Sequence, residues 1–65
     1  MKTLTNRELD VTKLVVEGKS NKEIANELFL SPHTIKFILE QIYEKLDVRN
    51  RVMLAIYYVK YIKKD

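Results

Sequence analysis

The sequence lacks the residues from which small proteins build disulfides and metal sites. It contains no cysteine and only one histidine among its 65 residues, so neither a disulfide framework nor a thiolate metal site can form. We therefore expect no metal and no other cofactor. The absence of cysteine also fits the reducing cytosol.

Long apolar runs are absent as well. No stretch approaches the about 20 residues that a helix needs to span a bilayer. The opening residues Met1, Lys2 and Thr3 begin no signal-peptide pattern. We expect a cytoplasmic protein with no membrane partner.

The residues of an enzyme site are missing too. Nucleophilic catalysis needs a serine or cysteine beside a base, and His33, the only histidine, has no acidic neighbour in the sequence. Paired carboxylates for acid–base catalysis need burial to displace their pKa values, whereas Glu40 and Glu44 fall on the expected solvated face of their helix. We therefore do not expect the protein to be an enzyme.

The composition is that of one small folded domain over residues 1–65. A hydrophobic share of 46% with 32% charged residues is typical of globular chains and not of disordered tails. The net charge is +3, from 12 Lys and Arg against 9 Asp and Glu. This excess of positive charge favours a polyanionic partner without deciding for one.

Two helices joined by a very short turn are predicted between Ser20 and Leu46. Ser20 with Glu23 forms a capping box, and Ser31 followed by Pro32 is a second helix start. Apolar residues recur at helical spacing after each cap: Ile24, Ala25 and Leu28, then Ile35, Leu39, Ile42 and Leu46. Two helices with so short a connection pack at a steep angle, which predicts a helix-turn-helix.

A first helix is predicted at 6–17. Thr5 and Glu8 form its capping box, and Gly18 suits a left-handed end. Its core stripe is expected to contain Leu4, Val11, Leu14, Val15 and Gly18. Leu9 and Val16 lie on the opposite face, either as ordinary exposed apolar residues or as a contact surface.

A last helix at 50–63, capped by Asn50, is apolar on two faces. One stripe suits the core: Ala55, Tyr58, Val59 and Ile62. The second stripe contains Met53, Ile56, Tyr57 and Tyr61. A terminal helix of so small a domain cannot bury both, so we interpret the second as a homodimer interface, the alternative being an exposed aromatic surface. The fold class is thus all-α, with helices at about 6–17, 21–29, 32–46 and 50–63.

The helix at 32–46 carries the candidate reading surface. Its outward positions include His33, Lys36, Phe37, Glu40 and Gln41. Lysine donates to guanine, glutamate accepts from cytosine and glutamine pairs with adenine in the major groove, while an apolar side chain contacts the thymine methyl. Candidate phosphate ligands are Thr34, at the start of this helix, and Asn21 and Lys22, at the start of the preceding one.

The same residues resemble a known family. The pattern comprises LTNRE at Leu4–Glu8, EGKSNKEIA at Glu17–Ala25, TIK at Thr34–Lys36 and KL at Lys45–Leu46, with Leu28, Ser31, Ile42, Val48 and Arg51. It is similar to the LuxR/FixJ-type (GerE/NarL-like) helix-turn-helix DNA-binding domain over about Leu4 to Val59. The resemblance implies a bacterial transcription regulator whose third helix enters the major groove and whose fourth helix forms a homodimer.

The resemblance also implies particular residue roles. Lys36, Phe37 and Glu40 would face bases, Lys22 and Thr34 would lie near phosphates, and Glu8 and Arg51 would form a structural ion pair. This chain departs from the family pattern at Ile38, where a histidine that donates to phosphate is usual, and at Glu40, where a basic or polar residue is frequent.

Two functional hypotheses remain open. The first is sequence-specific binding of double-stranded DNA as a transcriptional regulator or its output domain, with a receiver domain, a sensor domain or RNA polymerase as further partners. The second is a helical protein-interaction module that has lost DNA binding, for which Ile38 and the near-neutral reading helix are the motivation. Binding to duplex DNA discriminates between them.

Overall fold

The computed structural model describes residues 3–63, and every regular element in this range is helical. The elements are α1 (Asn6–Val16), α2 (Asn21–Leu28), α3 (Pro32–Leu46) and α4 (Arg51–Tyr57), followed directly by a π-helical turn, η1 (Tyr58–Ile62). The predicted all-α, four-helix fold is confirmed, and α3 has the bounds that its cap and apolar spacing predicted.

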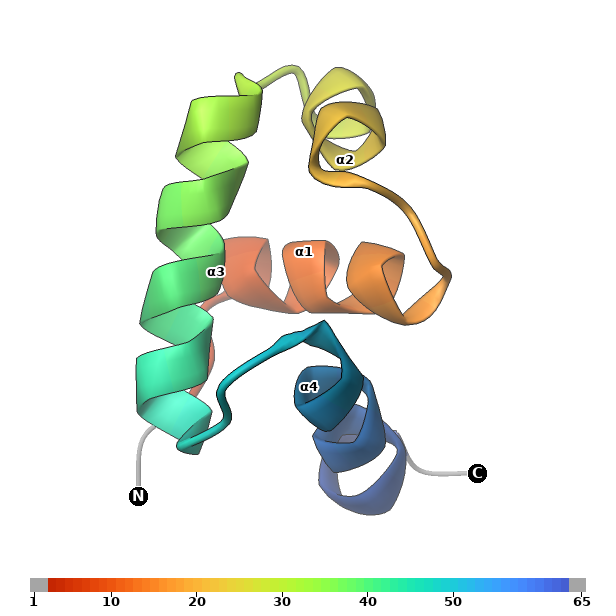
Figure 1. Ribbon diagram of the computed structural model, residues 1–65, viewed down its shortest axis with the longest axis vertical. Coiled ribbons are helices and arrows are strands. Elements are labelled where there is room, and N and C mark those ends of the chain that lie inside the picture. Colours follow the sequence, from red (N-terminus) through yellow and green to blue (C-terminus); the bar gives the residue numbers. More distant parts are fainter. Residues whose placement is uncertain (1–2, 64–65) are drawn as a thin grey trace.

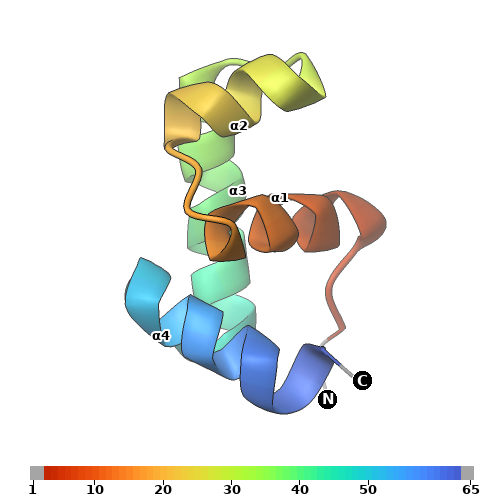
Figure 2. The same ribbon diagram turned by 90° about the vertical axis from the view of Figure 1, so that its right-hand side faces the viewer.

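The longest helix, α3, runs along one side of the molecule and α1 crosses it near the middle (Figure 1). α2 and α4 lie on opposite sides of α1, which Figure 2 shows again from a direction turned by 90°. α1 packs against α2, α3 and α4. It is therefore the element around which the core is assembled.

Side-chain caps begin all four α-helices, as predicted. Thr5 and Glu8 form a reciprocal capping box at α1, and Ser20 and Glu23 form one at α2. The hydroxyl of Ser31 accepts from the backbone N–H of Thr34 at 3.1 Å, and Asn50 caps α4. Each cap satisfies backbone donors that have no partner inside the helix, which fixes where the helix starts.

Three residues in left-handed conformations end the first three helices. Gly18 has φ 88°, and the N–H groups of Gly18 and Lys19 donate to the carbonyls of Val15 and Leu14, which is the Schellman arrangement. The predicted role of Gly18 is confirmed. Phe29 (φ 60°) and Asp47 (φ 55°) occupy the same region after α2 and α3 although neither is glycine.

The core lies where α1 meets the other three α-helices. Its largest fully buried apolar residues are Val11, Ile24, Ile35, Ile42 and Leu54. The stripes predicted for the first three helices supply four of these. Leu14 and Val15 of α1 and Leu39 of α3 are also buried, as expected.

The core stripe predicted for the last helix is wrong. Leu54 is its buried residue, whereas Ala55, Tyr58 and Ile62 are only partly buried and Val59 is exposed. α4 packs against α1, and Leu54 in its first turn is the residue that it buries in the core. Beyond Tyr57 the backbone bonds span five residues, as in Lys63 N–H to Tyr58 C=O at 2.8 Å, and a stripe of period 3.6 does not persist through a π-helical turn.

Candidate nucleic-acid interface

The helix-turn-helix predicted from the caps is present. α2 ends at Leu28 and α3 begins at Pro32, so three residues connect them. The inner face of α3 places Ile35, Leu39 and Ile42 in the core. With this face buried, the opposite face of α3 is turned to solvent along its length.

The residues predicted to face bases lie on that outer face. His33, Lys36, Phe37 and Glu40 are exposed and Gln41 is half-buried. The ring of Phe37 is 58% exposed, although it is a large apolar side chain. Within residues 3–63, no ion pair or side-chain hydrogen bond involves Lys36 or Glu40. Their charged groups are thus available to an external ligand.

The predicted phosphate ligands lie at the starts of α2 and α3. Lys22 is exposed, and Thr34 is half-buried with its hydroxyl 2.9 Å from that of Ser31. Asn21 is half-buried and its Oδ1 accepts from Nη1 of Arg51 at 2.7 Å. The Asn21 oxygen is therefore engaged within the protein, and its amide nitrogen remains available as a donor.

The predicted ion pair between Glu8 and Arg51 is wrong. Glu8 pairs instead with Lys45, whose Nζ lies 2.7 Å from Oε1 of Glu8, and Arg51 binds Asn21 and the carbonyl of Lys19. The reason is distance along α1. Glu8 is in its first turn beside the end of α3, whereas Arg51 reaches the chain just past its last turn, and an 11-residue helix is about 16 Å long.

The Glu8 carboxylate is held in its charged form. Its side chain is only 10% exposed, and this burial by itself raises the pKa. Hydrogen bonds from Lys45 and from the Thr5 N–H, together with the charge of Lys45, outweigh burial and lower the pKa of Glu8 below the ordinary value of 4.5. Glu8 and Lys45 therefore join α1 to the end of α3 structurally and are not a ligand site.

The face of α4 predicted to form a dimer is apolar and accessible. Met53, Ile56 and Tyr61 are exposed, Ile56 by 56%, and Tyr57 is half-buried. The rings of Tyr57 and Tyr61 lie 4.9 Å apart between centroids, and Nζ of Lys60 lies 5.7 Å from the centroid of Tyr61. We call Met53, Ile56, Tyr57 and Tyr61 the α4 surface. The structure leaves it uncovered within the single chain.

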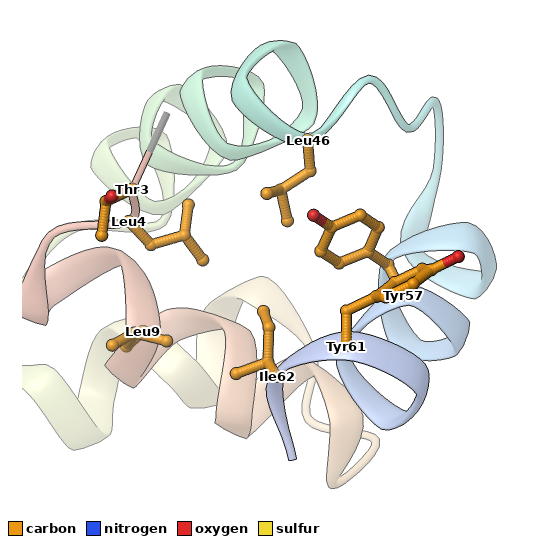
Figure 3. A pocket seen from close by; sticks show the side chains of 7 residues that line it. All are labelled: Thr3, Leu4, Leu9, Leu46, Tyr57, Tyr61 and Ile62. Carbon is orange, nitrogen blue, oxygen red and sulfur yellow. The ribbon is translucent and has the colours of Figure 1, made fainter. Parts of the chain in front are cut away.

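An apolar groove of about 300 Å³ adjoins the α4 surface (Figure 3). It is lined by Thr3, Leu4, Leu9, Leu46, Tyr57, Tyr61 and Ile62. Leu4 and Leu9 approach from the N-terminal side, and Tyr57, Tyr61 and Ile62 face them from the last helix. Leu9 is thus half-buried in a groove wall, and its exposed part faces an apolar surface and not open solvent alone.

Comparison with known sequences identifies the family. The model of the family described as "Bacterial regulatory proteins, luxR family" matches residues 2–58. The chain belongs to the LuxR family of bacterial regulatory proteins. The resemblance inferred from the sequence pattern is therefore confirmed, and the family is one of transcription regulators and not of enzymes.

Relatives of this LuxR-family chain are named as regulatory proteins. It is 47% identical over 55 residues to "Transcriptional regulatory protein LiaR" of Bacillus subtilis (strain 168), covering 85% of the chain. It is 42% identical over 57 residues to "Nitrate/nitrite response regulator protein NarP" of Escherichia coli (strain K12), covering 88% of the chain. In each case the chain spans 26% of the relative's length.

A third relative is much longer. "Putative HTH-type transcriptional regulator Mb0914c" of Mycobacterium bovis is 50% identical over 53 residues, which are 82% of this chain and 6% of that protein. The LuxR-family domain thus accompanies very different lengths of additional sequence in its relatives.

In residues 3–63 of the present chain, no helix has both the length and the apolar character that crossing a membrane requires.

Sequence reasoning missed one residue and one contact that shape this LuxR-family domain. Lys45, the partner of Glu8, stands out in the sequence only as part of a motif, although a basic residue in the last turn of a helix is favoured by the helix dipole. The link between Arg51 and Asn21 spans 30 positions, and nothing in the local sequence indicates it. Both partners are set by how the helices pack.

Proposed function

We propose that the chain binds double-stranded DNA sequence-specifically, as a transcriptional regulator or its output domain, with α3 in the major groove. The observation that carries the proposal is the outward orientation of Lys36, Phe37 and Glu40 on a helix anchored by its opposite face. An α-helix fits the major groove, where each base pair presents its own pattern of donors and acceptors. Membership of the LuxR family supports the same function.

In this proposal the residues of α2 and α3 divide into two roles. Lys36, Phe37, Glu40, Gln41 and His33 face the bases, while Lys22, Thr34 and the amide nitrogen of Asn21 bind phosphates. Phosphate contacts give the position on the duplex, and base contacts give the sequence preference. Because Lys36 and Glu40 balance each other, this helix adds little nonspecific attraction, and we propose that specificity depends on the base contacts.

The fourth helix completes the proposal. We propose that two copies associate through the α4 surface, so that the dimer reads two half-sites. A two-fold dimer uses the same patch on both copies, and the exposed apolar side chains of Met53, Ile56 and Tyr61 are of the kind that such an interface buries. A receiver domain, a sensor domain or RNA polymerase as further partners stays a prediction.

The proposal is tested by selecting duplexes from a random pool and measuring how Lys36→Ala changes the affinity for the selected site. We expect a roughly 5- to 150-fold loss of affinity and a weaker base preference at one position, since a good base contact contributes about 1–3 kcal/mol. Lys13→Ala, on the exposed face of α1, removes the same charge away from α3 and is the control. An unchanged affinity in Lys36→Ala would refute the proposed docking face. A failure of the unsubstituted protein to bind any duplex would favour the protein-interaction module.

A further inference from the structure

The start of α4 is tied to the start of α2 by one side chain. Nη1 of Arg51 donates to Oδ1 of Asn21 at 2.7 Å, and Nη2 donates to the carbonyl of Lys19 at 2.5 Å. Lys19 belongs to the connection between α1 and α2, and Asn21 is the first residue of α2. Among the side-chain hydrogen bonds of residues 3–63, these two are the ones that join α4 to this segment.

The chemistry of the guanidinium determines how Asn21 is oriented. Arginine has five N–H donors and no acceptor, so the atom of Asn21 that faces Arg51 has to be the amide oxygen. The amide nitrogen, with its two N–H donors, then lies on the other branch of the side chain. A phosphate oxygen accepts hydrogen bonds and cannot bind the amide oxygen, so this orientation is the one in which Asn21 can bind DNA.

Lys22 depends on the same anchor. It directly follows Asn21 in the first turn of α2 and is exposed. Its position relative to the duplex is set by where that first turn lies, which the two hydrogen bonds of Arg51 fix on one side. Arg51 itself is half-buried and has both terminal nitrogens engaged within the protein. It is therefore placed to hold the neighbouring donors and not to bind the duplex.

We propose that Arg51 is a positioning residue for phosphate binding, which holds the amide of Asn21 and the side chain of Lys22 against the DNA backbone. The inference rests on the proposed DNA-binding function. It replaces the structural role expected of Arg51 as a partner of Glu8 with a role at the DNA interface. It also gives the first turn of α4 a role in that interface, although this turn does not itself contact DNA.

The test measures how affinity for a 30-bp duplex of random sequence, a length of about three helical turns, depends on salt concentration. The slope of log affinity against log salt concentration is negative, and its magnitude, called the slope below, falls by about 0.9 for each phosphate that the protein no longer neutralises. Arg51→Lys keeps the charge but loses the planar fork that bridges Asn21 and Lys19, and we expect a smaller slope. Arg49→Lys, the same substitution at an exposed residue, is the matched control and should leave the slope unchanged.

The decisive comparison adds Lys22→Ala to each background. In the unsubstituted protein Lys22→Ala should lower the slope by about 0.9. In Arg51→Lys it should lower the slope no further, because Lys22 no longer reaches its phosphate in that background. The inference would be overturned if Lys22→Ala lowered the slope equally in both backgrounds. It would also be overturned if Arg51→Lys had the same slope as the unsubstituted protein. A role of Arg51 in stability alone would change the melting temperature and leave the slope as it was, which overturns it as well.

A second variant covers the case in which Arg51→Lys does not fold. Asn21→Asp keeps an acceptor for Arg51 and removes the amide donors, so the anchor stays and one phosphate ligand is lost. Here Lys22→Ala should still lower the slope by about 0.9, and its having no effect would contradict the inference. If the unsubstituted protein binds no duplex, the proposed function fails and the inference with it. If it binds but Arg51→Lys and Lys22→Ala have additive effects on the slope, the inference alone fails.

Discussion

Glu8 serves two parts of the protein with a single carboxylate oxygen. Its Oε1 accepts from the backbone N–H of Thr5 at 2.8 Å, which caps α1, and from Nζ of Lys45 at 2.7 Å, which holds the end of α3. Hydrogen bonds to a charged partner contribute about 1.5–3 kcal/mol each. Because Glu8 is largely buried and Lys45 only partly so, removing Lys45 leaves a poorly solvated carboxylate without its cation.

The first prediction at the residue scale concerns acid. The folded pKa of Glu8 is lowered below 4.5, so its stabilising effect is complete above about pH 4.5 and is lost as the pH falls through the folded pKa. In urea unfolding between pH 2 and 7, Glu8→Gln should therefore lack part of the acid-induced loss of stability, while keeping a capping side chain. Glu27→Gln, exposed on α2, is the control.

A steeper acid dependence in Glu8→Gln than in the unsubstituted protein would contradict this assignment. Hydrogen bonds from Ser20 lower the pKa of the capping residue Glu23 as well. It is present in every variant, so the difference between the curves of Glu8→Gln and the unsubstituted protein isolates Glu8. At neutral pH, Lys45→Met should lower the free energy of unfolding by about 1–3 kcal/mol.

At the scale of the element, α3 ends on a residue that does not suit its conformation. Asp47 has φ 55°, which glycine adopts without the steric cost of a Cβ. Its negative charge also meets the negative end of the helix dipole. We expect Asp47→Gly to raise the free energy of unfolding by about 0.5–1 kcal/mol, which is a melting temperature higher by about 2–8 °C in a domain of this size.

Two comparison variants separate the effect of the left-handed conformation of Asp47 from the effect of its charge. Phe29→Gly removes the same left-handed strain after α2 (φ 60°) from a side chain that is 94% exposed, with no change of charge. Glu44→Gly, inside α3 at an exposed position, should instead destabilise by about 0.5–1 kcal/mol, because glycine is costly within a helix. A destabilised Asp47→Gly would mean that its side chain has a partner in solution that offsets the strain.

Elements that depend on local patterns were predictable from the sequence, and those that depend on packing were not. Capping pairs three residues apart, such as Ser20 with Glu23, and the glycine at position 18 act within one turn, so the sequence alone predicts the helix starts and the end of α1. The partners of Glu8 and Arg51 lie at least 30 positions away, and sequence spacing carries no information about them. The π-helical turn that begins at Tyr58 likewise ends the 3.6-residue period that the expected stripe assumed.

The candidate site divides in the same way. The exposure of Lys36 and Phe37 follows directly from the buried positions Ile35, Leu39 and Ile42, which fix the outer face of α3 by periodicity alone. The role of the Asn21 side chain was incompletely predicted, because its oxygen is occupied by a residue from another helix. Periodicity therefore predicts which side of a helix is exposed, and only the packed structure shows which polar groups remain available.

At the scale of the whole molecule, the surface that we propose to face DNA and the α4 surface lie on different elements. α2 and α4 lie on opposite sides of α1 (Figure 2). Among the described residues, the large exposed apolar side chain of α3 is Phe37, whereas α4 exposes Met53 and Ile56. An interface on α4 would therefore leave α3 free to bind DNA. This separation makes the two proposed activities testable one at a time.

We expect Ile56→Glu to abolish cooperative binding to a DNA duplex with two half-sites while leaving affinity for a single half-site within about threefold. A charge placed in an apolar interface has to be desolvated without a partner, so each copy should still bind but no longer recruit the second. Phe29→Glu, which makes the same chemical change at an exposed residue after α2, should keep the cooperativity. The measurement is the binding isotherm on duplexes with one and two half-sites. Retained cooperativity in Ile56→Glu would exclude the α4 surface as the dimer interface.

The outer face of α3 takes almost no part in holding the protein together. Lys36 and Glu40 make no side-chain hydrogen bond or ion pair within residues 3–63, and exchanges at such surface positions usually change stability by less than about 0.5 kcal/mol. Under the proposed function, substitution of those few side chains would consequently change the DNA sequence that is recognised and leave the scaffold intact.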